Sequence, residues 1–267
     1  MYDFEFVKPA TVADAVAALA AGDAQAIAGG QTLLPTMKAR LAQADTLVSL
    51  TGIAEMRGVR AEGGVLRIGG GTTHAVVARE AASHYPALAS LAGRIGDPAV
   101  RTRGTIGGSI ANNDPSACYP AGALGSGATI TVTGADGARE IAADDFFQGM
   151  FATAMEEGEI VTEVAFPIPE AARYEKFIQP ASRFPLVAAF VARFADGVRV
   201  AITGASGDGV FRWREAEEAL SADFAPDAVR GLAAPDGSRM ISDLHGDGAY
   251  RAHLVTVMTR RAVAAAA

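Results

Sequence analysis

The chain has 267 residues, of which half are hydrophobic and one-fifth are charged, and its formal net charge is −7. This composition indicates a globular protein of one large or two ordinary domains and, because no basic stripe is visible, argues against a nucleic-acid partner. The single cysteine, Cys118, excludes an internal disulfide and a zinc or iron–sulfur cluster held by thiolates of this chain alone.

The beginning of the chain predicts a small βαβ-like module that ends near Gly52. Its first helix follows Thr11, which can cap it. A short buried strand runs into a glycine pair in QAIAGG, residues 25–30, and a helix is expected over 32–44. TLVSLTGI, residues 46–53, predicts the strand that completes the module.

The start, MYDFEFVKPA, is acidic and lacks the basic and apolar regions of a signal peptide. Charged residues or glycine interrupt every apolar run, so no stretch is predicted to span a membrane. We therefore expect a soluble, cytoplasmic protein.

Residues 63–80 repeat the order of strand, glycine loop and helix. Three glycines at 69–71 read as a tight turn, and Thr72 or Thr73 can cap the helix that follows. Another helix is expected over 85–96.

The rest of the chain predicts antiparallel strands and then helices. An Asp-Gly turn marks a hairpin over 127–141, and a strand follows over 159–169. FPIPEAARYEKF, rich in proline and charge, indicates a domain boundary. A second Asp-Gly hairpin over 186–205 and helices over 213–224 and 250–267 predict a small α+β domain.

Two glycine loops carry the functional signal: AGGQT, residues 28–32, and TIGGS, residues 105–109. Neither has the spacing of a dinucleotide-binding G-x-G-x-x-G motif or of a P-loop. Each pairs two glycines with hydroxyl residues, and successive backbone N–H groups at such turns bind anionic oxygens. Two such loops in contact would clamp a pyrophosphate. The polar stretch 101–122, without helix or strand periodicity, predicts a ligand-binding loop.

Other polar residues give no catalytic or metal site. The four histidines share no ligand spacing, and we expect His74 and His84 on helix surfaces. The Glu215, Glu217 and Glu218 group predicts a solvated helix face. Trp213 is expected in the core or at an interface.

AGGQTLLPTMKARL, residues 28–41, and GDPAVRTRGTIGGSIANNDPSACYPAGAL, residues 96–124, resemble the FAD-binding medium subunit of the molybdenum hydroxylases. These are the xanthine dehydrogenase and aerobic carbon monoxide dehydrogenase enzymes. The resemblance covers essentially the whole chain. It implies an α+β fold: an FAD-binding domain of the vanillyl-alcohol-oxidase (PCMH) type over 1–170, with two α/β subdomains over about 1–52 and 53–170, and a C-terminal α+β domain of antiparallel sheet and helices over 171–267.

The resemblance also implies the FAD contacts. The two loops would hold the pyrophosphate, Asp114 would lie toward the ribityl chain, Ile160 would touch the ring system, and Lys176 of YEKF would lie near the flavin. The full set is Ala28, Gly29, Gly30, Gln31, Thr32, Thr105, Ile106, Gly107, Gly108, Ser109, Asp114, Ile160 and Lys176. Cys118 stands where xanthine dehydrogenases place an acidic FAD contact, which leaves that contact open. Since no second cysteine can resolve an oxidised one, we favour a packed or mildly polar Cys118 over a redox-active one.

The function that the resemblance implies is an electron-transfer subunit. A large molybdopterin subunit would hydroxylate the substrate, and a small subunit with two [2Fe-2S] clusters would pass electrons to the FAD of this chain. NAD, a quinone or oxygen would then accept them, in a dimer of heterotrimers. Two alternatives stay open: a self-contained flavin oxidase or reductase of the same fold, and a non-catalytic module that binds a phosphate ligand. The sequence names neither the substrate nor the acceptor.

Overall fold

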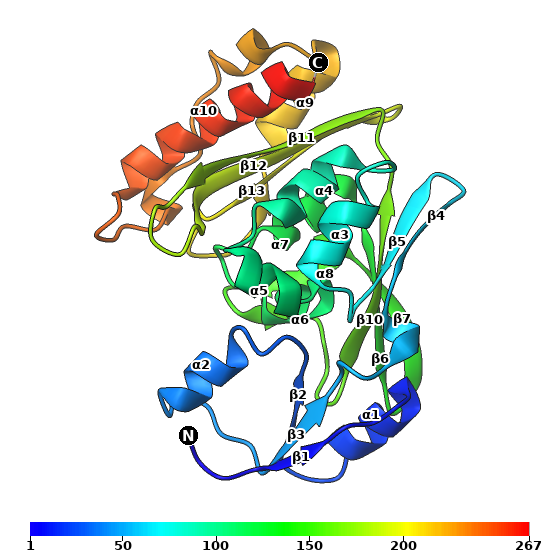
Figure 1. Ribbon diagram of the computed structural model, residues 1–267. Helices are drawn as coiled ribbons and strands as arrows, with labels where there is room; N and C mark the ends of the chain where they lie inside the picture. Colours follow the sequence, from blue (N-terminus) through cyan, green and yellow to red (C-terminus); the bar gives the residue numbers. More distant parts are fainter. Residues whose placement is uncertain (267) are drawn as a thin grey trace.

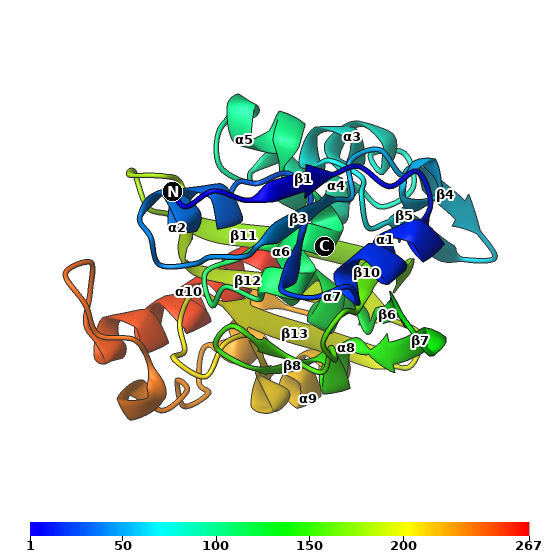
Figure 2. The ribbon, with the colours of Figure 1, turned by 90° about the horizontal axis from the view of Figure 1, so that it is seen from below.

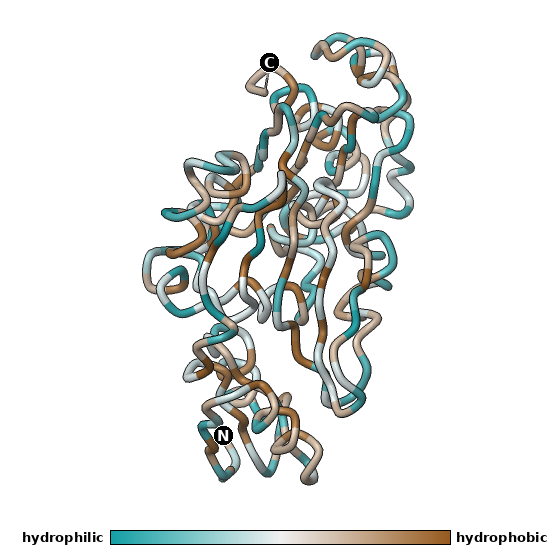
Figure 3. Tube along the Cα trace, turned by 90° about the vertical axis from the view of Figure 1, so that its right-hand side faces the viewer, coloured by the Kyte–Doolittle hydropathy of each residue, from teal (hydrophilic) through white to brown (hydrophobic). Residues whose placement is uncertain are grey.

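The computed structural model describes residues 1–266, which form three bodies stacked in chain order (Figure 1). A small N-terminal module lies at one end, a five-stranded sheet with its helices lies in the middle, and a four-stranded sheet with the long last helix lies at the other end. Hydrophobic segments run along the strands, and hydrophilic ones gather at the turns (Figure 3). The architecture is α+β, as predicted.

The N-terminal module is a three-stranded parallel sheet in the order β1-β3-β2 with two helices, and it crosses the end of the molecule (Figure 2). Its elements are β1 Glu5–Val7, α1 Val12–Leu19, β2 Ala24–Ile27, α2 Leu33–Lys38 and β3 Thr46–Ser49. The Thr11 hydroxyl accepts a hydrogen bond from the Asp14 N–H and caps α1. The βαβ unit is confirmed, because α2 connects two parallel strands.

Helix α2 is shorter than predicted and ends at Lys38 rather than near residue 44. Arg40 takes the left-handed conformation, with φ 59°, and the Leu41 N–H donates to the Thr36 carbonyl. This hydrogen-bond pattern closes a helix, usually with glycine at the left-handed position. An arginine stands there, so the sequence carries no stop signal.

The middle body is an antiparallel sheet in the order β4-β5-β10-β6-β7. Its strands are β4 Val59–Glu62, β5 Val65–Gly69, β6 Thr129–Gly134, β7 Gly137–Ala142 and β10 Ile160–Pro167. Its helices are α3 His74–Glu80, α4 Pro86–Gly93, α5 Pro98–Arg103, α6 Ile106–Asn112, α7 Tyr119–Ser126 and α8 Ala143–Phe146. The short elements η1 Ala54–Met56, β8 Phe147–Gly149 and β9 Ala152–Thr153 complete it. The hairpin that turns at Asp136 and Gly137 is confirmed.

The stretch 101–122 is largely helical, so the prediction of a polar loop was wrong. Thr105 caps α6 by accepting a hydrogen bond from the Gly108 N–H. The Gly107 N–H donates to the Gly70 carbonyl at 2.9 Å. Caps and contacts with distant segments here outweigh the low helix propensity of glycine.

The C-terminal body is an antiparallel sheet in the order β11-β12-β13-β14. Its elements are β11 Ala171–Ile178, β12 Pro185–Phe194, β13 Gly197–Thr203, β14 Phe211–Arg212, α9 Arg214–Ala222, η2 Pro226–Val229, η3 Gly237–Arg239 and α10 Gly248–Ala266. Strand β12 is buried on both faces: Phe190 packs in the core of the middle body, and Val191 packs in the core beneath α9 and α10. The predicted hairpin at Gly197 is confirmed, and Ala267 of the predicted last helix lies outside the described residues.

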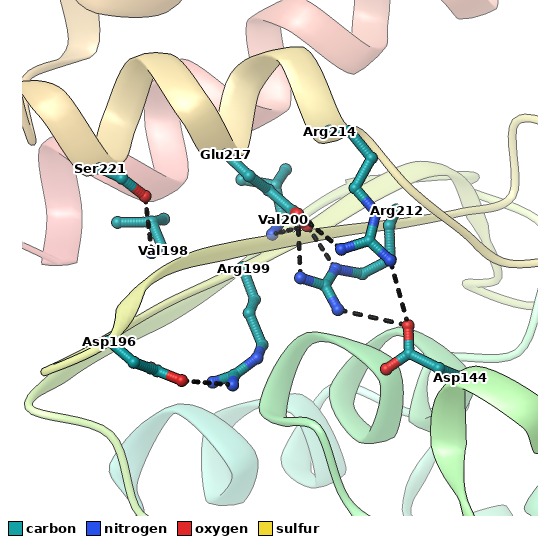
Figure 4. Close-up of polar contacts among 9 residues, drawn as sticks. All are labelled: Asp144, Asp196, Val198, Arg199, Val200, Arg212, Arg214, Glu217 and Ser221. Atoms are coloured by element: carbon teal, nitrogen blue, oxygen red, sulfur yellow. Dashed lines mark hydrogen bonds and ion pairs between the residues drawn. The ribbon is translucent and has the colours of Figure 1, made fainter.

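A cluster of ion pairs joins α8 to the start of α9 (Figure 4). Arg212 and Arg214 each reach Asp144 at 3.4 Å, and Glu217 pairs with both arginines. The Glu217 carboxylate also accepts the Val200 N–H at 2.9 Å. The prediction that Glu217 lies on a solvated face was therefore wrong, because partners from β13 and β14 bury it. Trp213 lies in the core, as expected.

Candidate functional site

One cleft takes its walls from all three bodies. This central cleft has a volume of about 970 Å³, within the range of roughly 300–1,000 Å³ that is typical of small-molecule and cofactor sites. Every predicted site residue except Ile106 lines it, and Ile106 is fully buried in the core of the middle body. Segments far apart in sequence, from residue 28 to residue 176, thus converge on one concavity.

The 28–32 loop connects β2 to α2 and leaves its peptide groups free. Within residues 1–266, the backbone N–H groups of Gly29, Gly30, Gln31 and Thr32 have no hydrogen-bond acceptor. Gly30 takes a left-handed conformation, φ 68°, which turns the chain sharply into the helix. The Gln31 side chain folds back to donate to the Gly29 carbonyl at 3.0 Å. Successive free N–H groups of this kind suit an anionic oxygen.

The 28–32 loop touches the backbone of the residues that lead into the 105–109 turn. A Cβ built on Gly29 would lie 2.2 Å from the Arg103 carbonyl oxygen and 2.6 Å from the Gly104 Cα. Gly108, on the next turn, is exposed to the central cleft, and a Cβ there would lie 3.8 Å from the Ala28 Cβ. The loops therefore meet at one seam, defined here by Gly29 and Gly104, and only glycine fits the first of these positions.

The 105–109 turn differs from its sequence-based interpretation, because the N–H groups of Ile106, Gly107, Gly108 and Ser109 already have acceptors. The N–H of Ile106 bonds to the Thr72 carbonyl, and the N–H of Gly107 bonds to the Gly70 carbonyl. The Gly108 N–H bonds to the Thr105 hydroxyl at 3.2 Å. Four of the five N–H groups of this turn have acceptors within residues 1–266, so the turn mainly offers a ligand close approach to its backbone, while the 28–32 loop offers four free donors.

The third glycine loop, residues 69–71, packs beneath this turn as a structural connection. A Cβ on Gly107 would lie 2.7 Å from the Gly70 carbonyl oxygen, and a Cβ on Gly70 would lie 2.0 Å from the Val161 carbonyl oxygen. Thr73 occupies the N-cap position of α3 but makes no capping hydrogen bond. Gly70 and Gly71 also line the central cleft, which the expectation of a plain tight turn missed.

Lys176 and Cys118 lie together at another part of the central cleft. Lys176, from β11, is 6% exposed and donates to the Arg94 carbonyl at 2.9 Å and to the Cys118 sulfur at 3.5 Å. Burial lowers the pKa of Lys176, while the neighbouring Cys118 opposes that shift. Cys118 is buried, which confirms the packed thiol. A third ammonium N–H of the lysine remains for a ligand.

Asp114 contributes to a polar wall of the central cleft, and Ile160 contributes to an apolar wall. The Asp114 carboxylate accepts the Ser116 N–H at 2.7 Å and holds the turn between α6 and α7. Ile160, on β10, is 2% exposed and packs in the core of the N-terminal module. The cleft thus combines polar and apolar walls, as a ligand with phosphate and ring parts requires.

His74 is not on a helix surface, and that prediction was wrong. It is the first residue of α3, 5% exposed, and it lines the central cleft. Burial and the nearby Arg101 lower its pKa from 6.5 to about 4. The ring lies against Tyr119, with 5.4 Å between the ring centroids. His84, by contrast, is exposed in a turn rather than on a helix.

The C-terminal body closes one wall of the central cleft with residues that the sequence analysis did not single out. They are Ser182, Arg183, Phe184, Pro185, Asp243 and His245. Ser182 and Arg183 form the β11–β12 turn in left-handed conformations, φ 59° and 60°. No motif marks them, because their position depends on how the sheets pack together.

No helix among residues 1–266 is long and apolar enough to cross a membrane. The same residues contain no group of three or more histidine, cysteine, aspartate or glutamate side chains that could hold a metal ion.

Comparison with known proteins places these features in context. Residues 2–169 match the family described as "FAD binding domain in molybdopterin dehydrogenase". The chain is 35% identical to the carbon monoxide dehydrogenase medium chain of Afipia carboxidovorans, over 97% of this chain and 95% of that one. It is 33% identical to the nicotine 6-hydroxylase medium subunit of Paenarthrobacter nicotinovorans, over 97% and 95%. Its fold resembles reconstituted CO dehydrogenase from Oligotropha carboxidovorans, with a TM-score of 0.91, 33% identity and coverage of 99% of this chain and 98% of that one.

Proposed function

The chain belongs to the family of FAD-binding subunits of molybdenum hydroxylases, and we propose that it is the electron-transfer subunit of a heterotrimeric enzyme of this family. It is an FAD-binding oxidoreductase subunit, and the molybdopterin cofactor and [2Fe-2S] clusters belong to partner subunits. Its fold is a vanillyl-alcohol-oxidase-type FAD-binding domain followed by a C-terminal α+β domain. Electrons would run from the clusters of the small subunit to an external acceptor.

The seam between the two glycine loops carries this proposal. Free N–H groups of the 28–32 loop stand beside a turn from which side chains are missing, so a diphosphate can approach both backbones. Charge-assisted hydrogen bonds to backbone N–H groups are stronger than neutral ones, which makes such a seam selective for an anion. The residues present therefore fit the phosphate part of FAD.

The 28–32 loop, Gly108, Asp114, Ile160 and Lys176 receive roles from their places in the central cleft. Bound FAD would supply the redox chemistry, because a flavin exchanges one or two electrons and joins one-electron clusters to a two-electron acceptor. The 28–32 loop and Gly108 would hold the diphosphate, and Asp114 would face the ribityl chain. Ile160 would contact the ring system and keep water from it, and Lys176 would place a positive charge near the ring.

The partners follow from the composition of this chain. One cysteine cannot hold two [2Fe-2S] clusters, so any iron–sulfur clusters that reduce this chain lie in another subunit. We propose a small iron–sulfur subunit and a large molybdopterin subunit, in a dimer of heterotrimers, with NAD, a quinone or oxygen as acceptor. Relatives are named for carbon monoxide and for nicotine, which supports a substrate site in the large subunit rather than in this chain. The cytoplasmic location remains a prediction.

Anaerobic reduction of the flavin tests the proposal. The purified chain, reconstituted with FAD, should show flavin absorption bands that persist with carbon monoxide, a purine, an N-heterocycle or an aldehyde. Adding the molybdenum and iron–sulfur subunits should allow one of these substrates to bleach the bands. Bleaching by a substrate in the chain alone would support a self-contained flavoenzyme instead. A chain that shows no flavin bands after reconstitution would favour the module that binds another phosphate ligand.

A further inference from the structure

His74 combines a place in the central cleft with an unmet hydrogen-bonding need. Its backbone N–H donates to the Gly104 carbonyl at 2.9 Å, which fixes the start of α3 against the residue that precedes Thr105. The side chain is 5% exposed. Its Nδ1 is sealed from solvent and has no partner within residues 1–266. Because Nδ1 is sealed, a ligand in the central cleft cannot reach it, and any hydrogen bond from the ring to a ligand must use the other nitrogen.

The imidazole ring of His74 can form a hydrogen bond with a bound molecule only through Nε2. Since Nδ1 is sealed, Nε2 is the one polar ring atom that can face the central cleft. A Cβ built on Gly104 would lie 2.6 Å from Nε2, and a Cβ built on Gly29 would lie 2.6 Å from the Gly104 Cα. Nε2 therefore lies beside the seam where the two glycine loops meet.

The protonation state of the ring follows from its surroundings. Burial and the Arg101 guanidinium, which donates to the Ile95 and Gly96 carbonyls at 3.0 Å, keep the imidazole neutral. A neutral imidazole carries one N–H and one bare nitrogen. With the proton on Nε2, the sealed Nδ1 is the bare nitrogen and the ring presents a donor toward the central cleft.

We propose that His74 is a ligand-binding residue whose Nε2–H donates a hydrogen bond to an oxygen of the diphosphate of a dinucleotide bound at the seam. The inference rests on the proposed FAD-binding function. It adds a side-chain donor to a seam that otherwise offers backbone N–H groups.

Three variants of His74 separate hydrogen bonding from packing. Phenylalanine keeps a ring of similar size without a donor, glutamine places an amide nitrogen near the position of Nε2, and asparagine places one near Nδ1. Affinity for FAD is measured by titrating flavin fluorescence with the apo chain. The exposed His84→Phe serves as the matched control. Thermal unfolding of each apo variant checks folding.

A hydrogen bond to a charged oxygen contributes about 1.5–3 kcal/mol, which corresponds to roughly 10-fold or more in affinity. We expect His74→Phe and His74→Asn to weaken FAD binding about 10-fold or more, His74→Gln to stay within about 3-fold of wild type, and His84→Phe to bind normally. Equal affinity of His74→Phe and wild type would overturn the inference. A loss in all three variants would assign His74 to packing and overturn it as well.

Nuclear magnetic resonance of the wild-type chain gives an answer even if the variants fold poorly. The ¹⁵N shifts of the His74 ring should report a neutral Nε2–H tautomer at pH 7, and the Nε2 signal should move when FAD is added. An Nδ1–H tautomer, or a ring that FAD leaves unchanged, would contradict the proposal. Failure of the wild type to bind FAD at all would instead contradict the proposed function, so the two failures are distinguishable.

Discussion

Gly29→Ala tests whether the contact between the glycine loops shapes the FAD site. The new Cβ would lie 2.2 Å from the Arg103 carbonyl oxygen, and real Cβ contacts do not fall below about 3.0 Å. One loop must therefore move by about 0.8 Å, because the clashing atoms belong to backbone and no side chain can rotate away. Overpacking of this kind destabilises a fold by roughly 1–3 kcal/mol.

The same movement displaces N–H groups from the phosphate. Loss of one charge-assisted hydrogen bond would weaken FAD binding about 10-fold or more. Urea unfolding of the apo chain and fluorescence titration with FAD measure the two effects separately. Gly231→Ala is the matched control, because no atom lies within 4 Å of its added Cβ. Wild-type affinity in Gly29→Ala would refute the idea that the seam binds the cofactor.

Three more predictions concern single residues of the central cleft. Gly108→Val should yield folded, largely flavin-free protein, because the valine γ carbons would fill the space toward Ala28. Full FAD occupancy in this variant would contradict the placement of Gly108 beside the diphosphate. Lys176→Met should lower the reduction potential of the flavin, because the lysine charge stabilises the anionic reduced ring. An unchanged potential would place Lys176 away from the ring. The pKa of His74 is about 4 in the folded chain, compared with an ordinary value of 6.5. As the pH drops from 6.5 toward 4, the unfolded chain therefore takes up a proton before the folded chain does. The free energy of unfolding then falls by up to about 3 kcal/mol. Apo His74→Gln should lose less stability over this window in urea unfolding, and a pH dependence parallel to wild type would contradict the shift.

Local signals in the sequence predicted much of this fold. Asp-Gly turns located both hairpins, because a glycine with positive φ suits a two-residue turn. Thr11 marked the start of α1 through a side chain that really caps it. The glycine loops pointed to the central cleft, since paired glycines beside hydroxyl residues allow a ligand to approach the backbone closely.

The errors share a different cause, which is contact between distant segments. Helix α6 contains Gly107, whose N–H finds its acceptor on Gly70, and nothing near it in sequence predicts that bond. His74 has the polarity of a surface residue, yet Tyr119 and Gly104 enclose it from elsewhere in the chain. Glu217 is buried by arginines that arrive on a neighbouring strand and at the start of its own helix. The C-terminal wall of the cleft likewise exists only after the sheets pack together.

The seam is a contact between peptide groups, and this has an evolutionary consequence. Gly29 rests on the Arg103 carbonyl and on the Gly104 Cα, so no side chain takes part in this contact. Every residue other than proline carries the same backbone N–H and C=O groups, so substitutions at neighbouring positions that keep the backbone conformation preserve this contact. Related proteins can therefore differ at the exposed position 31 and at many residues around it while they keep the same backbone contact. To keep this backbone contact, glycine is required only at positions such as Gly29, where an added methyl group would force the two segments apart.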